Sequence, residues 1–127
     1  MRTLLAAFLL GLAASAALAA DYKAECGSCH MAYPPKLLPA ESWRRIMARL
    51  EQHFGSDASL DAKAHAQIER TLTSNAGRRA GPPGPEPRIT QTRWFLKEHK
   101  AEIPPGKNPA NCIACHAGAE RGNYDDD

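Results

Sequence analysis

The sequence predicts a small, mainly α-helical fold in which a few short helices are joined by long, irregular loops. Hydrophobic residues recur in several stretches at the spacing of one helix face. No stretch shows the strict alternation of a strand, and the chain contains no valine, a residue typical of strands. Proline and glycine separate the periodic stretches, which indicates loops between them.

Three helices are expected, over residues 40–53, 61–75 and 92–100. Apolar residues of the first lie at Trp43, Ile46, Met47, Leu50 and His53/Phe54. Those of the second lie at Leu60, Ala64, Ile68 and Leu72, and its expected N-cap is Asp57 or Ser59. In the third helix, Phe95 and His99 lie four positions apart and therefore share a face.

The first 19 residues are predicted to be a secretory signal peptide. Arg2 supplies a positive start, an apolar run follows, and Ala17-Leu18-Ala19 matches a cleavage site. The run is shorter than the roughly 20 residues that span a bilayer, which disfavours an uncleaved membrane anchor. The protein is therefore expected in the periplasm of a Gram-negative bacterium, with no membrane span.

The remaining residues, 20–127, are expected to form one domain. Within it, residues 77–87 are rich in proline and glycine and predict a flexible, exposed linker. Residues 118–127 are small, polar and finally acidic, which predicts a frayed tail. The formal net charge is only +2 and no basic stripe is present, so nucleic acid is not an expected partner.

One five-residue pattern occurs twice and includes all four cysteines: Cys26-Gly27-Ser28-Cys29-His30 and Cys112-Ile113-Ala114-Cys115-His116. C-x-x-C-H is typical of c-type haem attachment. The two thiols can bond to the vinyl groups of one haem, and the histidine can ligate its iron. We therefore expect two haem c groups, and the predicted fold is that of a small c-type cytochrome packed around them.

The four cysteines allow two other interpretations, a zinc site and disulfide bonds. Four thiolates could hold one zinc ion, but both following histidines would then have no role. Disulfide bonds would not require the C-x-x-C spacing. Large aliphatic residues are few in residues 20–127, and two haems would supply the missing apolar core.

The opposite face of each iron needs a second ligand, and the candidates are His53 and His99. Both lie at the ends of predicted apolar helix faces beside aromatic residues. His65 is interpreted as a surface histidine. Methionine is disfavoured, because Met31 adjoins His30 and Met47 lies on a predicted core face. Local closure favours the pairs His30/His53 and His99/His116, but crossed pairing stays possible.

The chain resembles the small periplasmic dihaem cytochromes c. The resemblance covers nearly the whole exported domain except the linker. The matching blocks are Glu25–Pro35, Leu37-Leu38-Pro39 with Ser42-Trp43, His53-Phe54-Gly55 with Ala58-Ser59-Leu60, Arg88-Ile89-Thr90, Trp94-Phe95, Glu98-His99, and Asn111–His116 with Gly118-Ala119-Glu120.

The resemblance implies bis-histidine ligation of both haems, with His53 and His99 at the distal positions. It also implies periplasmic electron transfer to a small oxygen-binding monohaem cytochrome, from a b-type membrane cytochrome. We expect an electron carrier and no enzyme. The alternative is a peroxidase-like enzyme or small-ligand sensor, which would need one open iron site.

Overall fold

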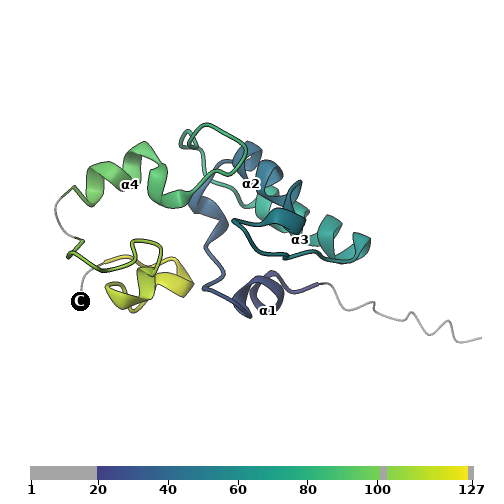
Figure 1. Cartoon of the computed structure of the whole chain (residues 1–127), viewed down its shortest axis with the longest axis horizontal. Helices are drawn as coiled ribbons and strands as arrows, with labels where there is room; N and C mark the ends of the chain where they lie inside the picture. Colours follow the sequence, from purple (N-terminus) through teal and green to yellow (C-terminus); the bar gives the residue numbers. More distant parts are fainter. Residues whose placement is uncertain (1–19, 101–102, 126–127) are drawn as a thin grey trace, which may run out of the picture.

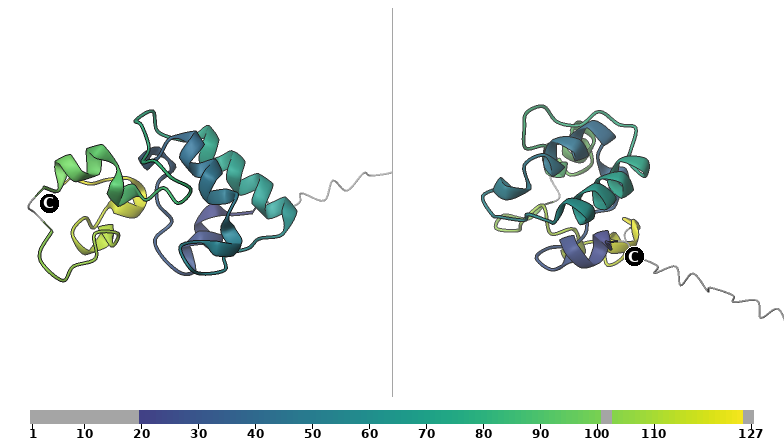
Figure 2. Two further views of the ribbon diagram at one scale, coloured as in Figure 1. Left: turned by 45° about the horizontal axis from the view of Figure 1, so that its top comes forward. Right: turned by 90° about the vertical axis from the view of Figure 1, so that its right-hand side faces the viewer.

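The computed structural model describes residues 20–100 and 103–125. This part of the chain consists of helices and loops, with isolated β-bridges but no strand. The α-helices are α1 (Tyr22–Gly27), α2 (Ala40–Met47), α3 (Ala62–Ser74) and α4 (Arg93–Glu98). Figures 1 and 2 place α1 to α3 at one end of an elongated molecule, and α4 with the C-terminal segment at the other. The predicted fold class is confirmed, and the expected signal peptide lies outside the described residues.

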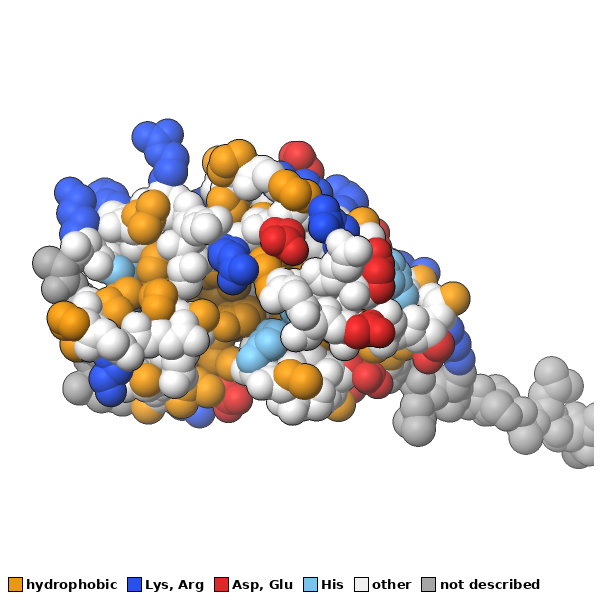
Figure 3. All heavy atoms as spheres, in the orientation of Figure 1, with side chains coloured by type: hydrophobic (Ala, Val, Ile, Leu, Met, Phe, Trp, Pro, Cys, Tyr) orange, Lys and Arg blue, Asp and Glu red, His pale blue; other side chains and the backbone are white. Residues whose placement is uncertain are grey.

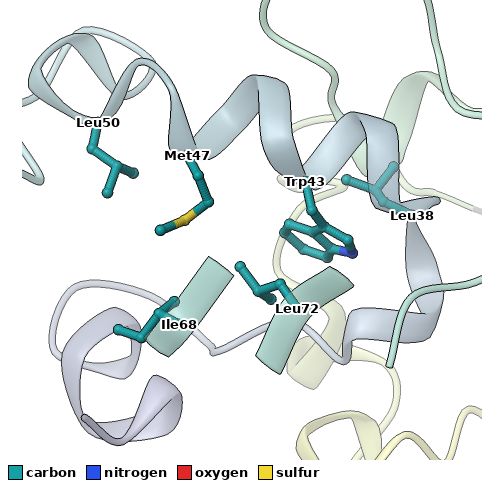
Figure 4. Close-up of a cluster of buried hydrophobic side chains, with 6 residues drawn as sticks. All are labelled: Leu38, Trp43, Met47, Leu50, Ile68 and Leu72. Carbon is teal, nitrogen blue, oxygen red and sulfur yellow. The ribbon is translucent and has the colours of Figure 1, made fainter. Parts of the chain in front are cut away.

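The hydrophobic core lies between α2 and α3. Figure 4 shows side chains of the two helices pointing toward one another across this interface. The core cluster consists of Leu38, Trp43, Met47, Leu50, Ile68 and Leu72. Trp43 also donates from Nε1 to the carbonyl oxygen of Pro35, at 2.8 Å, so its polar atom is satisfied within the apolar surroundings.

Helix α3 begins later than its expected caps. Its N-cap is Asp61, whose Oδ1 accepts hydrogen bonds from the backbone of Lys63 and Ala64, both at 2.9 Å. The prediction of Asp57 or Ser59 is therefore wrong. Asp57 instead accepts from the backbone and hydroxyl of Ser59, which closes a turn before the helix.

Helix α2 ends at Met47, six residues before the predicted end at His53. A turn follows, and then the 3₁₀ helix η2 (Leu50–Gln52). The apolar periodicity continues past the end of α2 because the side chain of Leu50 still enters the core. The carbonyl oxygen of Leu50 accepts a hydrogen bond from the backbone of Ala58 at 2.8 Å, which is not a helical hydrogen bond. His53 is consequently presented by a turn rather than by a helix face.

Residues 77–87 form a segment that packs on α2. Arg45 donates from its guanidinium to the carbonyl oxygens of Gly84, at 2.6 Å, and Pro82, at 3.2 Å. Gly81 lies so close to Ser42 that a Cβ would stand 2.1 Å from its Oγ. Pro82 and Pro87 are buried, so the predicted exposure of this segment is wrong at these residues. Glycine permits a close backbone approach here as well as flexibility.

The end that contains α4 has little apolar core of its own. Its buried residues are Pro87, Thr92, Phe95 and Ala119. The 3₁₀ helix η5 (Ala119–Arg121) continues into an ordered turn, in which the backbone of Asn123 donates to Gly118 at 3.1 Å. Residues 118–125 are thus folded, contrary to the predicted frayed tail. None of the described helices has the length and hydropathy needed to cross a membrane.

We expect the substitution Ile68→Ala to lower the free energy of unfolding by about 2–5 kcal/mol, because it leaves a cavity in the core. Ile68 is completely buried between α2 and α3. Denaturant unfolding followed by circular dichroism measures the loss. Arg70→Ala, at an exposed position of the same helix, should change it by no more than about 0.5 kcal/mol. Equal losses in both variants would contradict the assigned core.

Candidate haem-binding sites

The first C-x-x-C-H motif begins in the last turn of α1. Asp21 caps this helix by accepting from the backbone of Lys23 at 2.9 Å. Cys26 is half-buried in the helix, whereas Cys29 follows its end and is exposed. Burial, and next to it the negative charge of Glu25, raise the pKa of Cys26 to about 11. The histidine of this motif, His30, is exposed.

The second motif forms the 3₁₀ helix η4 (Cys112–Ala114) and the turn after it. The carbonyl oxygen of Cys112 accepts from the backbone of Cys115 at 3.2 Å and of His116 at 2.8 Å. This tight turn brings the histidine back beside the start of the motif. Cys112 is half-buried and Cys115 exposed, as in the first motif.

His53 faces the histidine of the first motif. The ring centroids of His30 and His53 lie 6.0 Å apart, and the ring planes differ by only 22°. Phe54 adopts a positive φ of 49° and its ring edge lies against His53, with centroids 4.8 Å apart. Burial, followed by the nearby His30, lowers the pKa of His53, although Glu86 opposes this shift. The neutral imidazole, which is the form that ligates metals, is thereby favoured.

His99 faces the histidine of the second motif. It follows α4, whose N-cap Thr92 accepts from the backbone of Phe95 at 3.3 Å. The His99 ring stacks on Phe95, with centroids 4.1 Å apart and planes 16° apart. The centroids of His99 and His116 lie 6.2 Å apart, with planes at 87°. The structure therefore brings together the two local pairs of histidines.

His65 lies away from both pairs, between α2 and α3. Its Nε2 donates to the carbonyl oxygen of Met47 at 2.9 Å, and its Nδ1 lies 3.8 Å from Oε2 of Glu69. Its side chain is 34% exposed, so it lies at the surface but is held in place. Met47 is buried in the core, as predicted.

The two alternative uses of the cysteines find no support in this geometry. None of the four cysteines forms a disulfide bond. Among residues 20–100 and 103–125, no three side chains of histidine, cysteine, aspartate or glutamate gather into a group that could hold a metal ion. The donor set present is instead two thiols and two facing imidazoles at each end, which fits one covalently bound haem at each.

Sequence reasoning missed a role for the tyrosines. The chain has three, and each lies beside a haem motif. Tyr22 precedes Cys26 by one helical turn, the ring of Tyr33 lies 5.2 Å from that of His30, and the ring of Tyr124 lies 5.6 Å from that of His116. Their nearness in sequence to the motifs was the available signal.

The described fold and its two C-x-x-C-H sites define a small haem-binding protein of the cytochrome c class. A family model described as dihaem cytochrome c matches residues 22–124. The chain belongs to this family, and the family carries two covalently bound haem c groups, typically for electron transfer. No relative was found among curated proteins.

Solved structures of similar chains agree with this assignment. The DHC purified from Rhodobacter sphaeroides is 47% identical, with a TM-score of 0.70 over 80% of this chain and 92% of that chain. The dihaem cytochrome type c of Shewanella baltica OS155 is 45% identical, with a TM-score of 0.70 over 82% of this chain and 85% of that chain. Both likenesses extend over most of either chain.

Replacing one pair of motif cysteines should remove one covalent haem. Cys26→Ala with Cys29→Ala is expected to leave one haem per chain, and so is Cys112→Ala with Cys115→Ala, because each pair supplies both thioether sulfurs of one haem. Mass spectrometry of the denatured protein counts the haems. Ser28→Ala, within the first motif, should retain two. Retention of two haems by either paired variant would refute the assignment.

Proposed function

We propose that this protein is an exported electron carrier in which each haem iron is ligated by two histidines. His30 and His53 would hold the first iron, and His116 and His99 the second. Cys26, Cys29, Cys112 and Cys115 would form the thioether bonds. The observation that carries the proposal is the separation of the facing histidine rings, 6.0 Å in one pair and 6.2 Å in the other.

This separation suits two imidazoles that share one metal ion. A ligating imidazole nitrogen lies about 2 Å from the metal. In a five-membered ring with bonds of about 1.35 Å, the ring centre lies roughly 1.15 Å beyond that nitrogen. Two rings on opposite sides of one iron would therefore have centroids about 6.3 Å apart. Both observed values agree with this distance, which supports local over crossed pairing.

In one histidine of each pair, a hydrogen bond from Nδ1 leaves Nε2 available for the iron. His30 donates from Nδ1 to the carbonyl oxygen of Met31 at 2.7 Å, and His99 donates from Nδ1 to that of Phe95 at 2.9 Å. A histidine that donates from Nδ1 has its Nε2 lone pair free for a metal. The same bonds fix the orientation of these two rings.

When bound, each haem supplies an iron that accepts and releases one electron reversibly. The protein residues supply the attachment, the ligands and the surroundings. Two imidazole ligands favour a lower reduction potential than one imidazole and one methionine. Met47 is buried in the core and Met31 is beside His30, so neither methionine replaces a distal histidine in the proposed ligand set. These features support a low-potential electron carrier as the proposed function.

The proposed location and partners rest on the sequence and the family. Members of the cytochrome c family are typically exported, and residues 1–19 have the pattern of a signal peptide. We place the protein in the periplasm, between a b-type membrane cytochrome as donor and a small oxygen-binding monohaem cytochrome as acceptor. On the face shown in Figure 3, basic side chains predominate over the end with α4, whereas acidic and basic side chains are mixed over the end with α2 and α3. Two partners could therefore be distinguished by charge.

Removing a distal histidine should convert one haem to high spin. His53→Ala and His99→Ala are each expected to abolish one of two low-spin ferric signals in electron paramagnetic resonance. The signals should be distinguishable, because the imidazole planes are nearly parallel in one pair and perpendicular in the other. The half-exposed His65 provides the matched control, and His65→Ala should keep both signals.

Two results would overturn this ligand assignment. One is a high-spin signal in the unaltered holoprotein, or carbon monoxide binding to its reduced form at one haem per chain. Either finding would favour the enzyme or sensor alternative. The other is a loss of low spin in His65→Ala together with its retention in His53→Ala.

The partner proposal predicts rapid oxidation of the reduced holoprotein by an oxygen-binding monohaem cytochrome. Stopped-flow mixing measures the rate, which should depend on ionic strength if opposite charges guide the encounter. A mitochondrial-type Met/His cytochrome c of comparable charge serves as the control acceptor for specificity. Equal rates with both acceptors would argue against a dedicated pair.

A further inference from the structure

The three tyrosines gather between the two haem motifs, and one of them joins the motifs directly. Tyr33 belongs to the loop after the first motif, and its ring lies 5.2 Å from that of His30, with planes 32° apart. Its hydroxyl donates to the carbonyl oxygen of Ala110 at 2.8 Å. Ala110 lies two residues before Cys112, so this hydrogen bond spans 77 positions and ends at the second motif.

Both partners of this hydrogen bond are themselves held in place. The carbonyl oxygen of Tyr33 accepts from the hydroxyl of Tyr22 in α1 at 2.8 Å. On the other side, the backbone of Ala110 donates to Oδ1 of Asn108 at 2.9 Å, and the backbone of Asn111 donates to the carbonyl of Asn108 at 3.0 Å. Tyr33 thus connects an anchored loop of the first site to an anchored turn of the second.

The surroundings of Tyr33 are partly closed to solvent. The side chain of Tyr33 is half-buried, and its hydroxyl makes the hydrogen bond to Ala110 from this position. Figure 3 shows a hollow between the two ends of the molecule, with hydrophobic side chains on its floor and a histidine at its edge. The two sites therefore meet across a mainly apolar region.

We propose that Tyr33 is a positioning residue that fixes the second haem-attachment segment relative to the histidine of the first, and thereby sets the rate of electron exchange between the two haems. This inference rests on the proposed electron-carrier function. The exchange moves one electron from an iron(II) to an iron(III) centre within the same chain, without a proton or a further reactant. Its rate falls steeply as the two centres separate, so a contact that holds them in register controls it.

The chain offers a closely matched pair of variants. Tyr33→Phe and Tyr22→Phe each remove one hydroxyl that donates to a backbone carbonyl oxygen at 2.8 Å. Only the first of these two bonds joins one motif to the other. In the one-electron-reduced holoprotein, relaxation after flash reduction measures the exchange rate. Tyr33→Phe should slow it severalfold, because the second haem-attachment segment is no longer tied to the first, whereas Tyr22→Phe, which leaves the contact with Ala110 in place, should slow it less.

A further variant tests the contact from its other side. Asn108 is exposed, and Asn108→Ala should loosen the turn that presents Ala110 and slow the exchange as well. The ferric low-spin signals of both haems should remain in all three variants, because no ligand is changed. A rate in Tyr33→Phe equal to that of the unaltered protein would overturn the inference, as would equal slowing in Tyr22→Phe. Failure of the ligand assignment would be recognised separately, by a high-spin signal before any substitution.

Discussion

The proposed ligation of the two haems depends on one constraint, which is that two imidazoles must face each other across the width of a single iron. A C-x-x-C-H motif fixes only one face of a haem, and the second histidine has to arrive from elsewhere at a defined distance. The chain meets this demand with two different local devices. A turn with a positive φ at Phe54 presents His53, whereas His99 is held at the end of α4 by its bond to the Phe95 carbonyl and by stacking on the Phe95 ring.

The apolar core is distributed unevenly between the two ends of the molecule. Helices α2 and α3 form a conventional core of six buried residues at one end, and this end carries His53. The other end buries little beyond Phe95, Thr92 and Ala119, and its segments approach one another around His99 and His116. Two covalent haems would supply large apolar faces, so the end with α4 should depend more on its cofactor for cohesion. Tyr33 connects these unlike ends.

Local patterns were sufficient to predict the fold class, the haem motifs and the family. They were insufficient where a backbone direction changed for tertiary reasons. Helix α2 ends at Met47, yet Leu50 still enters the core after the turn, so the apolar periodicity gave no sign that the helix ends there. Proline and glycine in residues 77–87 suggested an exposed linker, but Arg45 binds the backbone carbonyls of this segment and holds it against α2.

The sequence by itself determined the attachment chemistry: four cysteines at the spacing for two haems and a histidine after each pair, with three further histidines as candidates for the second ligands. Only the tertiary structure decided which histidines face one another, because ring separation and ring plane depend on how distant segments pack. It also decided that Tyr33 reaches Ala110, a contact across 77 positions that no local pattern records. Bonding capacity belongs to residue types, whereas distance and orientation arise only when the chain folds.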